Sequence, residues 1–340
     1  MPDALPAGPL RIGFVGCGRV TAELHLPALA RLEDVEAVAL ADPDTACARR
    51  VAGEFGIARV HPDAATLAAD PAVDLVAVCS PPRHHAEGAL AALAAGRHVF
   101  VEKPLALDLE SADALVAAVG DRVAAAGFNL RVHRQVVAAR AALAEGRLGE
   151  LRMIRTHWTA AARPAGWRAD PAQGGGALWE LAIHHLDLWR FLSGREPTGV
   201  RASGDDDTLA LTAQIEGGPL LATTVAVGTS DANQVELAGE QGRLLLDLYR
   251  GDGPLWMPIG RAAGGVGVRL RAAAGSAASL PRQALAARAG GDYRLSYTAE
   301  WEAVLAAVRD GTLPPANFEV GRRAVALAVA AERSLRDLVA

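Results

Sequence analysis

The first third of the chain alternates short apolar runs with longer Ala- and Leu-rich stretches. The runs have the length of buried strands, and stretches such as 87–95 and 109–119 are long enough to be crossover helices. This alternation is typical of βαβ units, whose strands lie parallel in one sheet. We therefore predict an α/β fold that opens with a doubly wound parallel sheet, with strands at 10–15, 35–40, 75–79, 98–101 and 123–128.

The pattern changes after residue 128. A helix at 134–145 ends at Gly146, a strand follows at 151–159, and a helix at 176–193 precedes strand-like runs at 209–215, 220–227, 234–237 and 244–248. Two further helices are expected at 294–309 and 319–337. We predict two domains, 1–128 and 129–340, the second being α/β with a mostly antiparallel open sheet.

Residues 253–291 fit neither pattern. They are rich in Ala, Gly and Arg, contain no acidic residue, and include five arginines from Arg261 to Arg288. We interpret the segment as an insertion or mobile arm, and we favour a solvated loop over a contact with another subunit or an anionic ligand.

Composition narrows the possible functions. With 340 residues, 51% of them apolar, and a net charge of −5, the chain can bury a sizeable core and has no basic run, which argues against nucleic acid or a membrane surface as partner. Cys17, Cys47 and Cys79 form no CxxC pair, which argues against a disulfide framework or a zinc site. The opening residues 1–6 lack a signal-peptide pattern, so we expect a cytoplasmic protein that acts on small molecules.

The basic residues are unevenly divided. Lys103 is the only lysine among the 34 Lys and Arg residues. Arginine serves for surface charge but offers a planar fork in place of a compact ammonium. Lys103 therefore marks a position where lysine chemistry is expected, although a leftover surface lysine is the simple alternative.

The first apolar run leads directly into a glycine turn and a helical stretch. A strand, a glycine turn and a helix N-terminus form the Rossmann arrangement that binds a dinucleotide pyrophosphate. Thr21 stands in place of the third glycine of GxGxxG, so the motif is incomplete. The candidate cofactor-binding residues of this loop are Gly16, Cys17, Gly18, Arg19 and Val20.

Asp42 closes the second strand, 21 residues after Thr21, near the offset of a carboxylate that binds the adenosine ribose. A 2′-phosphate would meet a like charge there, which favours NAD over NADP. Arg49 and Arg50 leave a rearranged NADP site open, and Asp42 could also simply start a turn before Pro43.

Lys103 follows the strand at 98–101, at the carboxyl end where open α/β sheets bind ligands. An ammonium at this place can stabilise charge on a reacting oxygen. Pro104 would fix the turn.

A second candidate site is the helix at 176–193. Glu180, His184 and Asp187 share one face at helical spacing, and the flanking positions are apolar. We predict that this polar stripe lines an enclosed cavity where His184 exchanges a proton with a hydroxyl and Glu180 holds or relays it. The alternatives are a core histidine with a carboxylate partner, and a metal pair, for which a third ligand is lacking. His185 is a weaker candidate.

These motifs together resemble the Gfo/Idh/MocA family, which includes glucose-fructose oxidoreductase and inositol dehydrogenase. The resemblance rests on residues 16–18 with 25–29, on 79–82 with His85, on 95–99 leading into 102–104, on 127–129, and on the triple glycine 174–176 followed by His184 and Asp187. Only residues 250–292 fall outside it.

The resemblance implies an NAD(P)-dependent oxidoreductase with Lys103 and His184 as the catalytic pair, and a homodimer or homotetramer. The family usually has Asp where this chain has Glu180, which puts the relay role in question. Family substrates include aldoses, inositols, nucleotide sugars and dihydrodiols. Further cofactor-binding residues are Ser80, Pro81, His85, Glu102 and Lys103, and hypothetical substrate residues are Asn129, Arg155, Trp158, Trp167, Asp187 and Tyr297.

Two other functions stay open. The protein could bind its cofactor as a sensor without turnover, although the presence of Lys103 and His184 argues against this. It could also be a glycosidase that oxidises its substrate transiently with a tightly held NAD.

Overall fold

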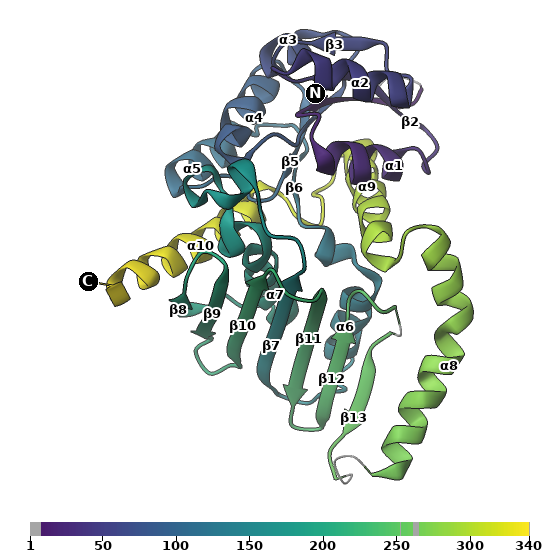
Figure 1. The fold of residues 1–340 in the computed structure, drawn as a ribbon, viewed down its shortest axis with the longest axis vertical. Coiled ribbons are helices and arrows are strands. Elements are labelled where there is room, and N and C mark those ends of the chain that lie inside the picture. Colours follow the sequence, from purple (N-terminus) through teal and green to yellow (C-terminus); the bar gives the residue numbers. More distant parts are fainter. Residues whose placement is uncertain (1–7, 252, 261–264, 340) are drawn as a thin grey trace. The chain divides into compact units, whose positions relative to one another are not determined.

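A computed structural model describes residues 8–251, 253–260 and 265–339 (Figure 1). The opening residues 1–6 and Arg261, which the predictions above used, lie outside the described residues. The chain divides into two compact units. One comprises the chain up to Asn129 with Ala172–Gly174 and Tyr297–Ala326, and the other comprises Leu130–Pro171, Gly175–Ser296 and the chain from Leu327 onward.

The first unit contains the predicted parallel sheet. Its six strands lie in the order β3-β2-β1-β4-β5-β6, and all neighbouring pairs are parallel. The order reverses at β1 and β4, which is the switch point of a doubly wound sheet. The strands are β1 (Leu10–Val15), β2 (Val35–Ala41), β3 (Arg59–His61), β4 (Leu75–Val78), β5 (His98–Glu102) and β6 (Ala124–Gly127).

Three helices of this unit, α2, α3 and α5, begin at side-chain caps. Asp44, Asp63 and Asp108 each accept a hydrogen bond from a backbone N–H of the first turn that follows. The helical segments are η1 (Thr21–His25), α1 (Leu26–Leu29), α2 (Thr45–Phe55), α3 (Ala64–Ala69), η2 (Pro82–His84), α4 (His85–Ala94) and α5 (Leu109–Ala118). A further turn, η3 (Asn129–Val132), begins at Asn129 and continues into the second unit.

The second unit contains a mostly antiparallel sheet, as predicted. Its order is β13-β12-β11-β7-β10-β9-β8, and β7 pairs parallel with β10 while the other neighbours are antiparallel. The strands are β7 (Leu151–Ala160), β8 (Thr198–Gly204), β9 (Thr208–Gln214), β10 (Leu220–Val227), β11 (Ala232–Gly239), β12 (Gly242–Asp247) and β13 (Leu255–Pro258).

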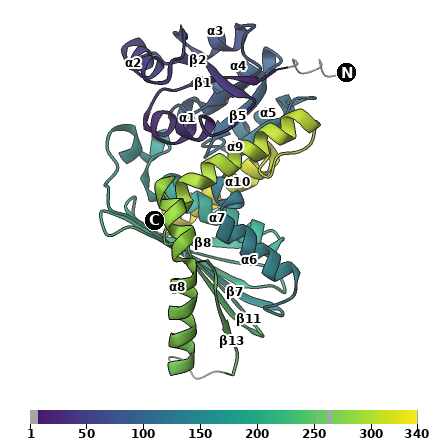
Figure 2. The ribbon, with the colours of Figure 1, turned by 90° about the vertical axis from the view of Figure 1, so that its right-hand side faces the viewer.

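Two helices, α6 (Arg134–Ala144) and α7 (Ile183–Ser193), cover one face of this sheet (Figure 2). Short helical turns η4 (Gly166–Ala169), η5 (Pro171–Gln173) and η6 (Leu178–Ala182) precede α7. Near the end of the chain, α9 (Asp292–Asp310) and α10 (Phe318–Val339) each contribute residues to both units.

The prediction of a loop for residues 253–291 is wrong. This segment forms β13 and the 23-residue helix α8 (Val266–Arg288), which runs beside the β13 edge of the sheet (Figures 1 and 2). Alanine, leucine and arginine are strong helix formers, and their abundance compensates for Pro281 within the helix. The prediction gave the glycines and the missing acidic residues more weight than this propensity.

Two buried histidines of the second unit predict how its stability depends on pH. Burial lowers the pKa of His133 and of His185 to about 4. An unfolded histidine binds a proton below about pH 6.5, whereas these two stay neutral in the native state. Between about pH 6.5 and about pH 4 the unfolded chain therefore binds more protons, and stability falls by up to about 3 kcal/mol for each histidine.

We expect His133→Gln and His185→Gln each to flatten this dependence. Denaturant unfolding at pH 7 and at pH 4.5, followed by tryptophan fluorescence, measures it. A double variant that loses as much stability between the two pH values as the unmodified protein would contradict the assignment.

Candidate functional site

The glycine loop after β1 packs against the end of β4. Gly16 has φ +94°, and a Cβ atom on it would lie 2.6 Å from the backbone nitrogen of Ser80. Only glycine combines this backbone conformation with so close an approach. The Thr21 hydroxyl donates a 2.7 Å hydrogen bond to the Gly16 carbonyl oxygen, so Thr21 fits in place of the third glycine because its hydroxyl is satisfied inside the loop.

The other side of the same loop is open. A Cβ atom built on Gly18 meets no atom within 4 Å. Val20 precedes η1 without a side-chain cap, and the Arg19 guanidinium pairs with Glu23 at 2.9 Å. An uncapped helix start behind a glycine with free space on its surface has the form that binds a pyrophosphate.

Asp42 is fixed at the end of β2 by two backbone groups. Its Oδ2 accepts a 2.8 Å hydrogen bond from the Cys17 N–H, and its Oδ1 accepts a 2.9 Å bond from the Asp44 N–H. Burial, with the neighbouring Asp42 carboxylate, raises the pKa of the Cys17 thiol to about 12, so this cysteine stays protonated. The Asp42 carboxylate is therefore oriented for a ribose, while Cys17 contributes its backbone.

His85 joins the turns after β4 and β5. Its Nε2 lies 2.7 Å from the Ser80 carbonyl oxygen and its Nδ1 lies 2.7 Å from the Pro104 carbonyl oxygen. Burial lowers the pKa of His85, against the two carbonyl contacts, which favour the charged ring. The Lys103–Pro104 peptide is cis. A neutral imidazole has a single N–H, so His85 donates to one of these carbonyl oxygens while its ring lies between the two turns.

Ser80 brings an unsatisfied group to this region. Its Oγ atom is buried and has no hydrogen-bond partner among the residues that the structure describes. The adjacent Pro81 leads into η2 at residues Pro82–His84. A buried hydroxyl without a partner beside the glycine loop suits a polar ligand atom. Together with Gly18 and Asp42, it fits a dinucleotide.

Lys103 follows β5 in the first unit, and its backbone is tied to the preceding side chain. The Lys103 N–H donates a 2.9 Å hydrogen bond to Glu102 Oε2. Glu102 Oε1 lies 3.0 Å from His25 Nε2, and His25 Nδ1 lies 3.1 Å from Trp301 Nε1. His25 stood in the family motif without an assigned role, and Trp301 was not singled out, because contacts between residues so distant along the chain leave no local pattern.

The two carboxylates of the predicted polar stripe each bind an arginine from another segment. The segment begins with the π-helical turn η6, and Glu180 accepts hydrogen bonds from Arg168 Nε at 3.1 Å and Nη2 at 2.5 Å. A Cβ atom on Gly175 would lie 2.3 Å from the Arg168 carbonyl oxygen, so the loop that carries Arg168 is packed tightly against the start of the helix. Glu180 therefore anchors this loop.

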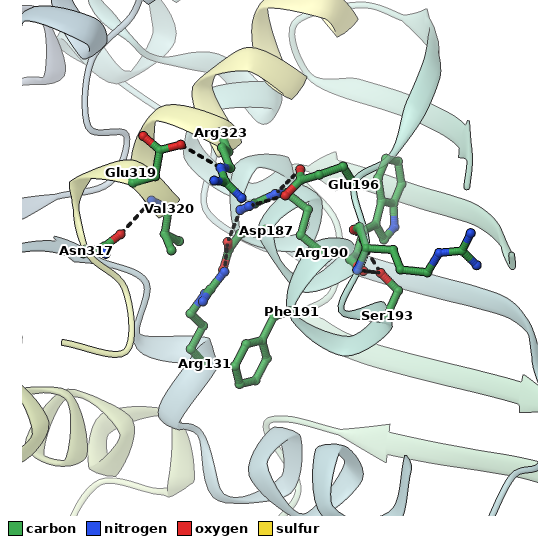
Figure 3. A network of polar contacts seen from close by, with 12 residues as sticks. Arg131, Asp187, Arg190, Phe191, Ser193, Glu196, Asn317, Glu319, Val320 and Arg323 are labelled. Carbon is green, nitrogen blue, oxygen red and sulfur yellow. Dashed lines mark hydrogen bonds and ion pairs between the residues drawn. The ribbon is translucent and has the colours of Figure 1, made fainter. Parts of the chain in front are cut away.

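Asp187 is bound elsewhere. Its two carboxylate oxygens accept bonds of 2.7 Å each from Arg131 Nε and Nη2, and Arg190 Nη1 lies 3.6 Å away (Figure 3). Arg190 also pairs with Glu196. The carboxylate is 1% exposed and held by two guanidinium groups, so both of its oxygens are engaged by arginine in this structure.

His184 lies in an aromatic cluster. Its ring centre is 5.2 Å from that of Trp158, which is also 5.4 Å from that of His185. Trp158 Nε1 donates a 2.9 Å hydrogen bond to the Tyr249 hydroxyl, and Tyr293 packs edge-on against Tyr249. His185 is turned toward Asn233 Oδ1 at 3.1 Å. Trp158 was expected here, whereas Tyr249, Tyr293 and Asn233 were not.

The remaining expected substrate residues are dispersed. Arg155 lies on the opposite face of β7 from Trp158, because side chains alternate along a strand, and it pairs with Glu236 at 2.5 Å. Tyr297 belongs to the first unit and packs edge-on against His25 at 5.3 Å. Asn129 is buried at the end of the first unit, and Trp167 is half-buried in η4.

Two searches of the described residues gave negative results. Within the described part of the chain, no group of three or more His, Cys, Asp or Glu side chains is arranged to hold a metal ion. Over the same residues, no helix combines the length and the apolar character needed to cross a membrane.

Comparison with known proteins agrees with the fold. Residues 10–126 match the oxidoreductase family with an NAD-binding Rossmann fold, and residues 136–245 match the GFO/IDH/MocA C-terminal domain. The chain belongs to the Gfo/Idh/MocA family of oxidoreductases. It is an enzyme, a nicotinamide-dependent dehydrogenase or reductase.

Three relatives illustrate the similarity. The chain is 29% identical to inositol 2-dehydrogenase of Rhizobium meliloti, over 96% of this chain and 97% of that protein. The crystal structure of a putative myo-inositol dehydrogenase from Sinorhizobium meliloti has a TM-score of 0.77 at 26% identity, covering 96% of this chain and 98% of that one. The structure of levoglucosan dehydrogenase in complex with NADH shares the fold, with a TM-score of 0.80 at 21% identity and 97% of each chain covered.

The two glycines of the loop give a matched pair of variants. Gly16→Ala forces a methyl group against the Ser80 nitrogen at positive φ, so we expect both the melting temperature and the NADH affinity to fall. Gly18→Ala meets open space in the free protein, so we expect an unchanged melting temperature and an affinity about tenfold weaker, because the methyl group lies where the phosphates approach. Thermal melts and NADH fluorescence titrations measure both quantities. Unchanged NADH affinity in the two variants would exclude this loop as the cofactor site.

Proposed function

We propose that the protein oxidises a carbinol carbon of a sugar, an inositol or a related polyol with NAD, with Lys103 and His184 as its catalytic residues. The observation that carries the proposal is the place of the only lysine. Lys103 follows the carboxyl end of a central strand of the parallel sheet, with its N–H bound to Glu102. Ligands of open α/β sheets bind at this end.

The substrate class is supported by two kinds of observation. One relative that matches 96% of this chain is an inositol dehydrogenase, and the NADH-bound structural neighbour is a levoglucosan dehydrogenase. In this chain, the Trp158 ring packs against His184, and Tyr249 and Tyr293 contact Trp158 in turn. Aromatic faces and edges pack well against the C–H groups of a polyhydroxylated ring, while the Tyr249 hydroxyl supplies a polar handle.

The roles of the residues follow from their chemistry. The bound nicotinamide cofactor supplies the hydride acceptor. The Lys103 ammonium donates a hydrogen bond to the substrate oxygen and stabilises its negative charge as the hydroxyl proton leaves. The His184 imidazole accepts that proton, and in the reverse direction it returns it. Glu180 also binds Arg168, and Asp187 binds Arg131.

Substitution of the catalytic pair tests the proposal. We expect Lys103→Met and His184→Gln each to lower kcat/KM for the best substrate of an inositol and sugar panel by roughly 100-fold or more, with NADH affinity changed by less than about threefold. Lys103→Arg keeps the positive charge but not the compact ammonium donor, so we expect its activity to be little higher than that of Lys103→Met.

Initial rates of NADH formation measure the loss of kcat/KM. The control is His84→Gln, at an exposed histidine. Activity equal to that of the unmodified protein in Lys103→Met would refute the role of the lysine. Reducing sugar released from a glycoside without net NADH would identify a glycosidase instead.

Asp42 predicts the cofactor preference. Because its carboxylate is held at the end of β2 by the Cys17 and Asp44 N–H groups, a 2′-phosphate would face a fixed negative charge. We expect kcat/KM to be at least about tenfold higher with NAD than with NADP. In Asp42→Ser, which removes the carboxylate, we expect the ratio of kcat/KM with NAD to kcat/KM with NADP to be smaller. A preference of the unmodified protein for NADP would contradict the assignment.

A further inference from the structure

We propose that Trp301, His25 and Glu102 form a positioning relay that fixes the backbone of Lys103 before any ligand binds. The four residues are linked by three successive hydrogen bonds. Trp301 Nε1 bonds His25 Nδ1 at 3.1 Å, His25 Nε2 bonds Glu102 Oε1 at 3.0 Å, and the Lys103 N–H bonds Glu102 Oε2 at 2.9 Å. All four belong to the first unit. This inference rests on the proposed role of Lys103.

The direction of the relay follows from its first member. An indole N–H can only donate, so His25 Nδ1 must accept and carries no hydrogen. The hydrogen of the neutral imidazole is therefore on Nε2, where it donates to Glu102. Glu102 receives donors on both oxygens, one from His25 and one from the Lys103 backbone. Trp301 thus selects the histidine tautomer that the carboxylate needs.

The surroundings make these bonds strong. His25 is 0% exposed, and the rings of Phe14, Phe100, Tyr297 and Trp301 lie around it at centre distances from 5.3 to 6.2 Å. In an apolar enclosure of this kind a buried hydrogen bond that loses its partner is costly.

The charge state of Glu102 is set by the same contacts. Burial alone would raise the pKa of Glu102, but the hydrogen bond from His25 and the charges of its neighbours, including Lys103, lower it below its usual value. Glu300, on α9, shows the opposite behaviour, because burial and the nearby Glu102 charge raise its pKa well above its usual value. Of the two buried carboxyl groups, Glu102 is therefore the ionised one.

The relay completes a clamp on the lysine turn. On one side of the turn, His25 acts through Glu102 on the Lys103 N–H. On the other side, His85 contacts the Pro104 carbonyl oxygen at 2.7 Å. Because the turn at Lys103 and Pro104 is held on both sides, the Lys103 ammonium does not lose backbone conformational entropy when the reaction takes place. His25, Glu102 and Trp301 are positioning residues, since they act through Lys103.

Two amide substitutions separate the halves of the relay. The amide group of Gln reaches about as far as His25 Nε2, so His25→Gln retains the bond to Glu102 and loses the one to Trp301. The amide of Asn reaches only as far as Nδ1, so His25→Asn retains the bond to Trp301 and leaves Glu102 without its donor. The matched control is His61→Asn. His61, on β3, lies 3.1 Å from Asp70, and three strands separate β3 from β5 in the sheet order.

The single lysine gives a readout that does not depend on turnover. In this chain an amine-directed reagent such as trinitrobenzenesulfonate reacts only with Lys103 and the N-terminus, and mass spectrometry of the Lys103 peptide measures its rate. We expect His25→Asn to raise this rate at least about fivefold and to lower kcat about tenfold or more, with KM for NAD changed by less than about threefold. His25→Gln and His61→Asn should stay within about threefold of the unmodified protein in both measurements.

Equal labelling rates and equal kcat values for folded His25→Asn and His25→Gln would overturn the relay. If the histidine variants do not fold, Trp301→Phe takes their place, because it removes the indole N–H and keeps an aromatic ring. An unchanged labelling rate of Lys103 in Trp301→Phe would also overturn the relay. A shifted labelling rate in a protein that turns over no polyol would leave the relay standing and refute the proposed function. If Lys103→Met loses activity while His25→Asn is labelled at an unchanged rate, the proposed function stands and the relay is refuted.

Discussion

The structure around Lys103 depends on the two hydrogen bonds that the buried Glu102 carboxylate accepts, from His25 and from the Lys103 N–H. This carboxylate is ionised although it is buried, because the His25 imidazole and the Lys103 N–H each satisfy one of its oxygens. A buried charge that loses one such partner becomes a penalty of several kcal/mol. The end of β5, the indole of Trp301 and the lysine turn are therefore constrained together, and the glycine loop packs against the neighbouring end of β4.

Polar groups in the second unit follow a different rule. Three of them, Glu180, His184 and Asp187, were expected to cooperate because they are spaced along one helix. Each also has a partner on another segment: Arg168 for Glu180, the Trp158 ring for His184 and Arg131 for Asp187. Arginine forks bind carboxylates in two places at once, and such pairs leave no signal in the spacing along a helix. His184 remains the polar member that lies among aromatic rings.

Much of the fold could be predicted from local patterns. Apolar runs of strand length gave the parallel sheet, and a glycine turn after the first run gave the dinucleotide loop at Gly16 and Gly18. Local patterns failed where long-range contacts decide. Residues 253–291 lack a helical periodicity of buried positions yet form α8, and Arg155 was grouped with Trp158 without regard to strand alternation. The contact between His25 and Trp301 joins positions 276 residues apart, so no pattern within a window could indicate it.

The core of the first unit has a consequence for how the chain acquires its structure during synthesis. Trp301 and Phe318 are fully enclosed side chains of this unit, yet they lie in the segment Tyr297–Ala326 near the end of the chain. A nascent chain that has left the ribosome only as far as the last parallel strand has the sheet without the indole that anchors His25. Completion of this unit must therefore wait until Tyr297–Ala326 has been synthesised, and until then part of its apolar surface stays uncovered.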